Sequence, residues 1–121
     1  MPDRARVDAF IKTVEAGEYV RAIELFYADS ATMRENLQPP RGPLSVLVKY
    51  ERAALKQVES IKARPTERIL IDGDRVVINW IFDIMGLDGV TRTMDELTIQ
   101  RWQGDKIVEE QFYYDPNLPV S

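Results

Sequence analysis

The sequence predicts an α+β fold in which three N-terminal helices pack on a strongly curved, mainly antiparallel sheet. Apolar residues recur with a helical period in the first half of the chain, whereas the second half has the patterning of strands separated by short turns. A run of helices followed by a run of antiparallel strands places the helices on one face of a sheet. Long strands with a proline or a bulge curl, so we expect a cone-shaped hollow between the two layers.

The first helix is predicted to begin after Asp3 as its cap and to end at Gly17. Its apolar face is formed by Val7, Phe10, Ile11 and Val14. A second helix is predicted from about Glu18 to Tyr27. A third begins at Pro43, a residue that suits the first turn of a helix. The apolar stripe of this third helix is Leu44, Leu47, Val48, Leu55 and Val58.

The predicted strands follow from the turn residues between them. A short strand over Ala31–Glu35 precedes a loop over Asn36–Gly42. The strand predicted over Ile61–Ile71 is interrupted by Pro65, which implies an edge position or a bulge. Arg75–Met85 is almost wholly apolar, which predicts that both of its faces are covered. The last hairpin, 91–115, turns at residues 103–105, and residues 116–121 are expected to form a loose tail.

Composition limits the chemistry. The 121 residues suit one domain, 1–121, and a net charge of −4 without a basic run disfavours nucleic acid as a partner. The absence of cysteine and histidine removes thiolate catalysis, the commonest general base and the commonest transition-metal ligands. Acid–base chemistry must then fall to Asp, Glu, Tyr, Lys or water. We expect no metal, because no loop clusters carboxylates with suitable spacing, and no cofactor.

Neither a signal sequence nor a membrane span is recognisable. The N-terminal ten residues lack an apolar core, and no stretch approaches the roughly 20 apolar residues of a membrane-spanning helix. We therefore expect a cytoplasmic protein that does not use a membrane as a partner.

Three segments together resemble the SnoaL-like branch of the nuclear transport factor 2-like (NTF2-like) superfamily, which includes polyketide cyclases, limonene epoxide hydrolase and ketosteroid isomerase. They are residues 26–31 (FYADSA), the Pro-Pro-Arg-Gly loop at 39–42, and 104–109 (GDKIVE) leading to Tyr113-Tyr114-Asp115. The resemblance spans nearly the whole chain. It implies a cystatin-like cone that opens between helices and sheet and binds small apolar molecules.

The resemblance also places the family's functional residues on this sequence. The family histidine falls on Glu110, the tryptophan on Gln111, and the catalytic aspartate of cyclases and the epoxide hydrolase on Phe112. The Arg and Asp of the epoxide hydrolase fall nearest to Asn79 and Ile81. The first helix offers Phe10 where ketosteroid isomerase has a tyrosine that helps to hold the oxyanion.

Alternation along the last two strands suggests a different acid–base pair. If Phe112 points inward, so do Glu110 and Tyr114, and Glu96 points inward with Met94, Thr98 and Gln100 on the preceding strand. Glu96 and Glu110 are then expected to share one apolar hollow, with adjacency across the hairpin as one arrangement. Two carboxyls placed in this way do not both ionise easily, so one pKa should rise. We expect Glu96 and Glu110 to act as acid and base, with Tyr114 or Tyr27 donating a hydrogen bond to a substrate oxygen. The alternative is that the glutamates pair with Arg34, Arg92 or Arg101, or lie at the solvated rim of the sheet.

The expected pocket and partners complete the sequence-based hypothesis. The pocket residues are Tyr27, Met33, Glu35, Asn36, Met94, Thr98 and Phe112, where Asn36 either orients a ligand or serves the turn before the prolines. Trp80 and Phe82 are expected in the core or at the ligand. Trp102 and the Leu97/Ile99 face are expected to form a homodimer surface. Three functions stay open: a cofactor-free isomerase, cyclase or hydrolase, a non-catalytic protein that binds a small apolar ligand, and a protein-interaction module.

Overall fold

The computed structural model describes residues 1–117 and consists of three helices and six strands. The helices are α1 (Arg4–Glu15), α2 (Tyr19–Phe26) and α3 (Leu44–Leu55). The strands are β1 (Tyr27–Glu35), β2 (Val58–Ala63), β3 (Ile69–Asp72), β4 (Arg75–Gly86), β5 (Thr91–Gln103) and β6 (Lys106–Tyr113). Most of the expected C-terminal tail, residues 118–121, lies outside the described part. Among the described residues, no helix is long and apolar enough to cross a membrane.

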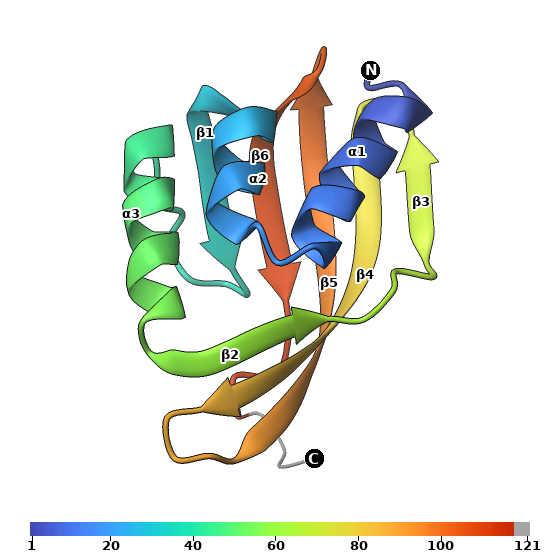
Figure 1. Cartoon of the computed structure of the whole chain (residues 1–121). Coiled ribbons are helices and arrows are strands. Elements are labelled where there is room, and N and C mark those ends of the chain that lie inside the picture. The colour runs from blue at the N-terminus through green and yellow to red at the C-terminus, as the bar shows by residue number, and fades with distance from the viewer. Residues whose placement is uncertain (118–121) are drawn as a thin grey trace.

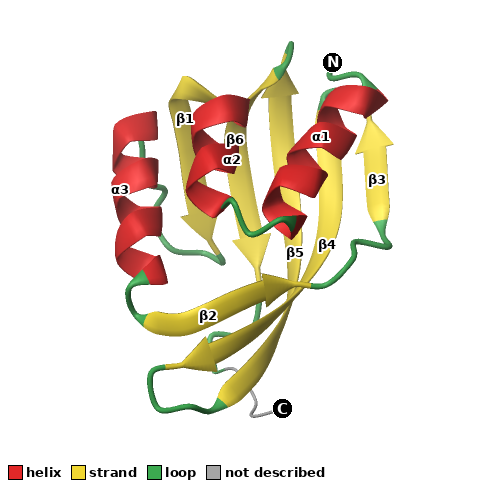
Figure 2. Cartoon of the chain, viewed as in Figure 1, coloured by secondary structure: helices red, strands yellow, loops and turns green. Residues whose placement is uncertain are grey.

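The helices cover one face of a curled sheet, as predicted (Figure 1). The strand order is β1-β6-β5-β4-β2, and β3 pairs with β4 on the same edge as β2. In the described part of the chain, every pairing is antiparallel except that of β1 with β6. Figure 2 shows β2 running across the foot of the helical layer, where it closes one side of the space between helices and sheet.

Local sequence signals set the ends of the helices. The side chain of Asp3 accepts a hydrogen bond of 2.8 Å from the backbone N–H of Arg6, which satisfies one free donor at the start of α1. Gly17 adopts a φ of 81°, a conformation that favours glycine, and the chain turns there into α2. The third helix begins after Pro43, which is its N-cap rather than a residue of its first turn.

Three predicted boundaries differ from the structure. Tyr27 is already extended, with φ −101° and ψ 142°, so the second helix ends at Phe26 and β1 begins four residues earlier than predicted. Val58 lies in β2 rather than on the third helix. The predicted strand over residues 61–71 is two strands that pair with opposite ends of β4, because the segment around Pro65 leaves the sheet between them.

Phe10 lies at the centre of the aromatic core. Its ring meets those of Phe26, Tyr27, Trp80 and Trp102 edge-on at centroid distances of 5.4–6.3 Å. Edge-to-face pairs at these distances add to the gain from burying apolar surface. One helical side chain therefore ties α1 to α2, β1 and two strands of the sheet.

The outer face of the sheet is the less covered one. Leu97 and Ile99 on β5 are 48% and 41% exposed. On β4 the outward side chain of Val77 is half-buried, so β4 is fully covered only on its inner face. The assignment of Trp102 to this face was wrong. It is 1% exposed because it shares the inward parity of Glu96 and Gln100. Pairing of this face with a second copy stays a prediction.

Removing the ring of Phe10 should lower the free energy of unfolding by about 3–5 kcal/mol, the range for a buried Phe→Ala change that leaves a cavity. Urea denaturation of Phe10→Ala measures this. Leu25→Ala is the matched control, because Leu25 is 40% exposed and should change stability by about 1 kcal/mol or less. A loss at Phe10 no larger than at Leu25 would contradict the central position of this ring.

If the outer face forms a dimer, Ile99→Glu should dissociate it, because a charge would replace apolar surface at the contact. Sedimentation equilibrium at micromolar concentration should give a dimer for the unaltered chain and a monomer for the variant. Leu70→Glu, at a side chain 70% exposed on the edge strand β3, should leave the dimer intact. A monomeric unaltered chain would refute the dimer.

Candidate functional site

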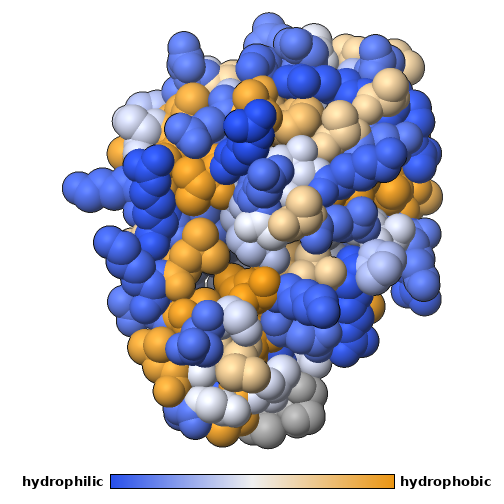
Figure 3. Space-filling view, viewed as in Figure 1, coloured by the Kyte–Doolittle hydropathy of each residue, from blue (hydrophilic) through white to orange (hydrophobic). Residues whose placement is uncertain are grey.

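A cavity of about 250 Å³ lies between the helices and the inner face of the sheet. It opens among hydrophobic residues near β2 (Figure 3). Seven of the residues predicted for the site line it: Tyr27, Met33, Glu35, Met94, Glu96, Glu110 and Phe112. Trp80 and Phe82 line it as well, so they serve both the core and the cavity wall.

Three other predicted site residues, Thr98, Tyr114 and Asn36, do not line the cavity. Thr98 is fully buried and donates to Glu96 at 3.1 Å. The Tyr114 hydroxyl donates to Glu35 at 2.9 Å, so it is engaged with the protein rather than with the cavity. Asn36 has a φ of 49° and accepts the backbone N–H of Tyr114 at 3.1 Å, which is the turn role expected before the prolines.

Strand register decides which acids share the cavity. Glu96, Thr98 and Gln100 are buried on β5 and alternate with exposed residues, as the predicted parity requires. Glu110 lies opposite Gln100 across the hairpin, and Glu96 lies opposite Trp80 on β4. Glu96 is therefore four residues from the position facing Glu110, and the two acids are not cross-strand neighbours.

Glu110 is held by neutral donors. Gln100 Nε2 donates to one carboxyl oxygen at 2.6 Å, and the Tyr27 hydroxyl donates to the other. The indole N–H of Trp102 donates to Gln100 Oε1 at 2.9 Å, which orients the amide toward the acid. Tyr27 is thus the partner of a carboxyl group and has no free hydroxyl proton for a substrate oxygen.

Burial raises the pKa of Glu110 from its ordinary 4.5 to about 7. The hydrogen bonds from Gln100 and Tyr27 oppose this shift because they favour the ionised form. Burial, followed by the negative charge of Glu110, raises the pKa of the Tyr27 phenol well above 10, so this hydroxyl stays protonated.

Glu96 has fewer hydrogen bonds. It is 6% exposed, and one of its carboxyl oxygens accepts from Thr98. The other oxygen has no hydrogen-bond partner among residues 1–117. Burial, followed by repulsion from Glu110, raises the pKa of Glu96 to about 8. At neutral pH this acid is mainly protonated, whereas Glu110 is near its midpoint.

None of the three arginines proposed as alternative partners pairs with these acids. Arg34 donates to the backbone oxygen of Gln38 at 2.8 Å. Arg92 pairs with Asp88 and Arg101 with Glu109, both near turns or on the outer face. Glu96 and Glu110 consequently remain buried acids without a salt bridge in the described part of the chain.

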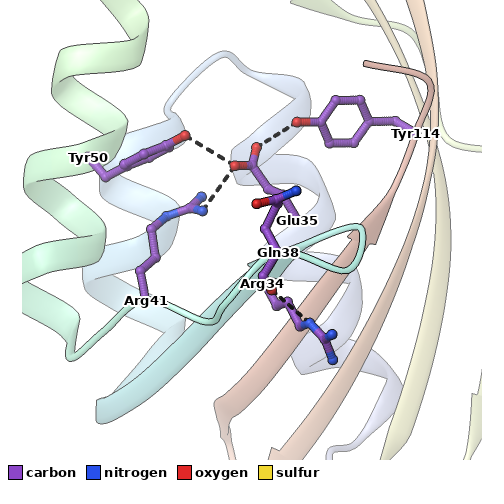
Figure 4. Close-up of polar contacts among 6 residues, drawn as sticks. All are labelled: Arg34, Glu35, Gln38, Arg41, Tyr50 and Tyr114. Carbon is purple, nitrogen blue, oxygen red and sulfur yellow. Dashed lines mark hydrogen bonds and ion pairs between the residues drawn. The ribbon is translucent and has the colours of Figure 1, made fainter.

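The cavity mouth carries a separate polar group centred on Glu35 (Figure 4). One carboxyl oxygen accepts from Tyr114, and the other accepts from Arg41 at 3.0 Å and Tyr50 at 3.1 Å. The Arg41 guanidinium also stacks on the Tyr50 ring at 3.6 Å. These contacts join β1, the loop after it, α3 and the end of the last strand.

Arg41, Tyr50 and Glu51 line the cavity but were not predicted. Glu51 follows Leu47 by four residues and precedes Leu55 by four, so its place on the apolar stripe of the third helix was the missed signal. Burial raises the pKa of Glu51, and Arg41 opposes this shift. Arg41 lies in a loop, where no periodicity indicates the direction of a side chain. In residues 1–117, no group of three or more potential ligands could hold a metal.

Solved structures with the same architecture place the chain in a known fold. A Mesorhizobium loti protein proposed to be a SnoaL-like polyketide cyclase is 22% identical, with a TM-score of 0.76 over 91% of this chain and 97% of that one. A Catenulispora acidiphila protein with a ketosteroid isomerase-like fold, in complex with trimethylamine, is 16% identical, with a TM-score of 0.78 over 93% and 87%. This chain has the SnoaL-like, NTF2-like fold.

A third structure extends the comparison. A Xanthomonas campestris protein of unknown function with a cystatin-like fold matches the NTF2-like chain with a TM-score of 0.80 and 14% identity, over 94% of this chain and 91% of that one. No protein-family model matches the sequence, and no curated protein sequence matches it. The comparisons thus show the fold and leave the function to be inferred from the cavity.

The buried acids should make stability fall as pH rises. Between about pH 4.5 and 8 the folded protein keeps protons that the unfolded chain has lost, so the free energy of unfolding decreases with pH. Glu96→Gln keeps an acceptor for Thr98 and removes the charge, so it should raise stability at pH 8 by on the order of a few kcal/mol. Urea denaturation from pH 5 to 9 measures both effects.

Glu109→Gln is the control for this titration. Glu109 points outward, pairs with Arg101 at 2.7 Å and is largely exposed, so its loss should change stability by about 1 kcal/mol or less. Carboxyl carbon NMR provides an independent readout, with midpoints near 8 for Glu96 and near 7 for Glu110. Midpoints near 4.5 for both acids would refute the raised pKa values.

Proposed function

We propose that the protein is a cofactor-free enzyme that moves a proton at carbon in a small, largely apolar substrate, as isomerases and cyclases do. One observation carries this proposal: Glu96 and Glu110 are buried without a salt bridge on the wall of one apolar cavity, with pKa values near neutrality. A general base works best when its pKa is close to the working pH. Perturbed acids in a cleft are also a pointer to function.

Glu110 has the properties of the base. Its hydrogen bonds from Tyr27 and Gln100 fix the carboxyl group and leave each oxygen with a further lone pair for a proton. In the proposed step the ionised Glu110 takes a proton from a carbon next to a C=O or C=N group. The C–H electron pair forms a new C=C bond, and the electrons of the original double bond move to the oxygen or nitrogen.

Glu96 has the position to hold that oxygen or nitrogen. When it is protonated it can donate to a carbonyl oxygen, and when it is ionised it can accept from a nitrogen. Return of the proton from Glu110 to another carbon completes an isomerisation. Attack of the new C=C on a second group in the same substrate completes a cyclisation. A hydrolase would use the same base on a water molecule.

A non-catalytic binding protein is the second candidate. Phe112 lines the cavity at the position where the resemblance places the catalytic aspartate of cyclases. A phenyl ring there adds apolar contact and removes an acid, which suits binding without turnover. The trimethylamine in the Catenulispora acidiphila structure supports small-molecule binding as a use of this fold. The protein-interaction alternative has no comparable observation in its favour.

Exchange of hydrogen for deuterium at carbon tests the enzyme. Single-ring probes such as cyclopentanone and 2-methyl-1-pyrroline are incubated in D2O at pH 7, and loss of the signal of the hydrogens next to the C=O or C=N group is followed by proton NMR. We expect the protein to accelerate exchange of at least one probe and the rate to rise through pH 7 as Glu110 ionises. Glu110→Gln should reduce the rate by about 10²-fold or more.

Glu109→Gln is the matched control, because it removes an outward-facing acid from the adjacent position of the same strand. It should retain the full exchange rate. Binding of the probes without accelerated exchange would favour the non-catalytic protein. Equal rates for the unaltered chain and Glu110→Gln would reject Glu110 as the base.

A further inference from the structure

The charges on the cavity wall are strongly unbalanced. Four carboxyl groups line it, those of Glu35, Glu51, Glu96 and Glu110, against a single guanidinium, that of Arg41. Arg41 is bonded through Nη1 to Glu35 at 3.0 Å and stacked on Tyr50, and its Nε is buried without a hydrogen-bond partner among residues 1–117. In the part of the chain that the structure describes, the other three carboxyls have no cationic partner within salt-bridge distance.

Glu96 is the wall residue best placed to receive a ligand. It is 6% exposed, it lines the cavity, and Thr98 occupies only one of its two oxygens. The second oxygen accepts no hydrogen bond from residues 1–117, and it is not one of the fully buried atoms that lack a partner. It is therefore accessible from the cavity, where an N–H group of a ligand can donate to it.

The surroundings of this oxygen are apolar and aromatic. Trp80 faces Glu96 across β4 and β5, and the Phe82 ring stacks on Trp80 with a centroid distance of 5.8 Å. Met94 lies opposite Phe82 in the same register and also lines the cavity. A ligand with one polar head and a hydrocarbon body therefore fits this corner of the cavity better than a polar molecule does.

The sign of the head group follows from the groups that face Glu96. Glu110 on β6, Glu35 on β1 and Glu51 on α3 act on Glu96 with negative charge. Among the described residues, Arg41 is the only cation on the wall. A carboxylate ligand would add a charge of the same sign, as would an enolate formed from a ketone. An ammonium or iminium ion would instead neutralise charge, and aromatic rings also attract cations.

We propose that the cavity binds a small organic ammonium or iminium ion, with its nitrogen beside the free oxygen of Glu96 and its hydrocarbon part against Trp80, Phe82 and Met94. If this ion is the substrate, the inference rests on the proposed function, in which Glu110 removes a proton from carbon, and it names the class of that substrate. Glu110 takes a proton from the carbon next to C=N⁺, and the electron pair moves onto nitrogen and gives a neutral enamine. No negative charge forms in the acidic cavity. An apolar cavity of about 150 Å³ holds benzene in another protein, so a single-ring ligand fits 250 Å³.

Titration calorimetry with three probes of one shape tests the inference without any turnover. The probes are cyclohexylamine, cyclohexanol and cyclohexanecarboxylate at pH 7, which are a cation, a neutral molecule and an anion. The cation should bind at least about tenfold more tightly than the other two, equivalent to about 1.4 kcal/mol. Its binding should also release up to about one proton, because ionisation of Glu96 accompanies it. Two buffers of different ionisation enthalpy measure this release.

Variants locate the nitrogen. Glu96→Gln should abolish proton release and weaken the binding of cyclohexylamine by about tenfold. It should have little effect on the binding of cyclohexanol. Glu109→Gln, on the outer face, should behave like the unaltered chain. Equal or tighter binding of the alcohol or the carboxylate, absence of proton release, or absence of binding by all three probes would overturn the inference. These outcomes concern binding alone and decide the matter whether or not Glu110 catalyses exchange, and the measurements on the unaltered chain decide it even if Glu96→Gln does not fold.

Discussion

Glu110 is a buried acid that neutral hydrogen-bond donors hold in place, and much of the inner wall follows from that arrangement. Tyr27 approaches from the junction of α2 and β1, and Gln100 approaches from β5 with its amide oriented by Trp102. An arginine in their place would stabilise the carboxylate and lower its pKa strongly. Amide and phenol donors compensate burial only in part, so the acid stays poised near neutral pH. The same contacts connect β1, β5 and β6.

Separation of the charged groups is the second constraint on the cavity. Arg41, the one cation on the wall, lies at the mouth with Glu35, Tyr50 and Tyr114, whereas Glu110 lies deeper and is 3% exposed. At the mouth the charges of Glu35 and Arg41 nearly cancel, and the hydrogen bonds of Glu35 join several elements of the fold. Deeper in the cavity, Glu96 and Glu110 have no cationic partner among the described residues. Ionisation of the inner acids destabilises the folded protein. Functional sites often carry such a cost in stability.

Much of this wall could be predicted because strand alternation is a strict rule. The period of two predicts that Glu96, Thr98, Gln100 and Glu110 lie on one face, and the turn at Gly104 defines the hairpin. The same parity places Trp102 on the inner face, so the prediction that Trp102 belongs to the outer surface was wrong. Tyr114 and Arg41 were harder to place, because the first lies beyond the last ladder pair and the second lies in a loop. Their side-chain directions depend on Glu35, a tertiary contact that local sequence does not encode.

Phe112 and Glu110 lie two residues apart on β6, and both line the cavity. Residues two apart on a strand point to the same side and are about 7 Å apart along the chain, since each residue advances the strand by about 3.3 Å. Phe112, where the resemblance implies an aspartate, is half-buried, whereas Glu110 on the same face of the strand is 3% exposed. If Glu110 is the base, as proposed, the reactive carbon of a substrate lies beside Glu110 rather than beside Phe112. The phenyl ring of Phe112 adds apolar surface to the cavity wall, and charge interactions around the two buried acids are stronger in such a low-polarity environment.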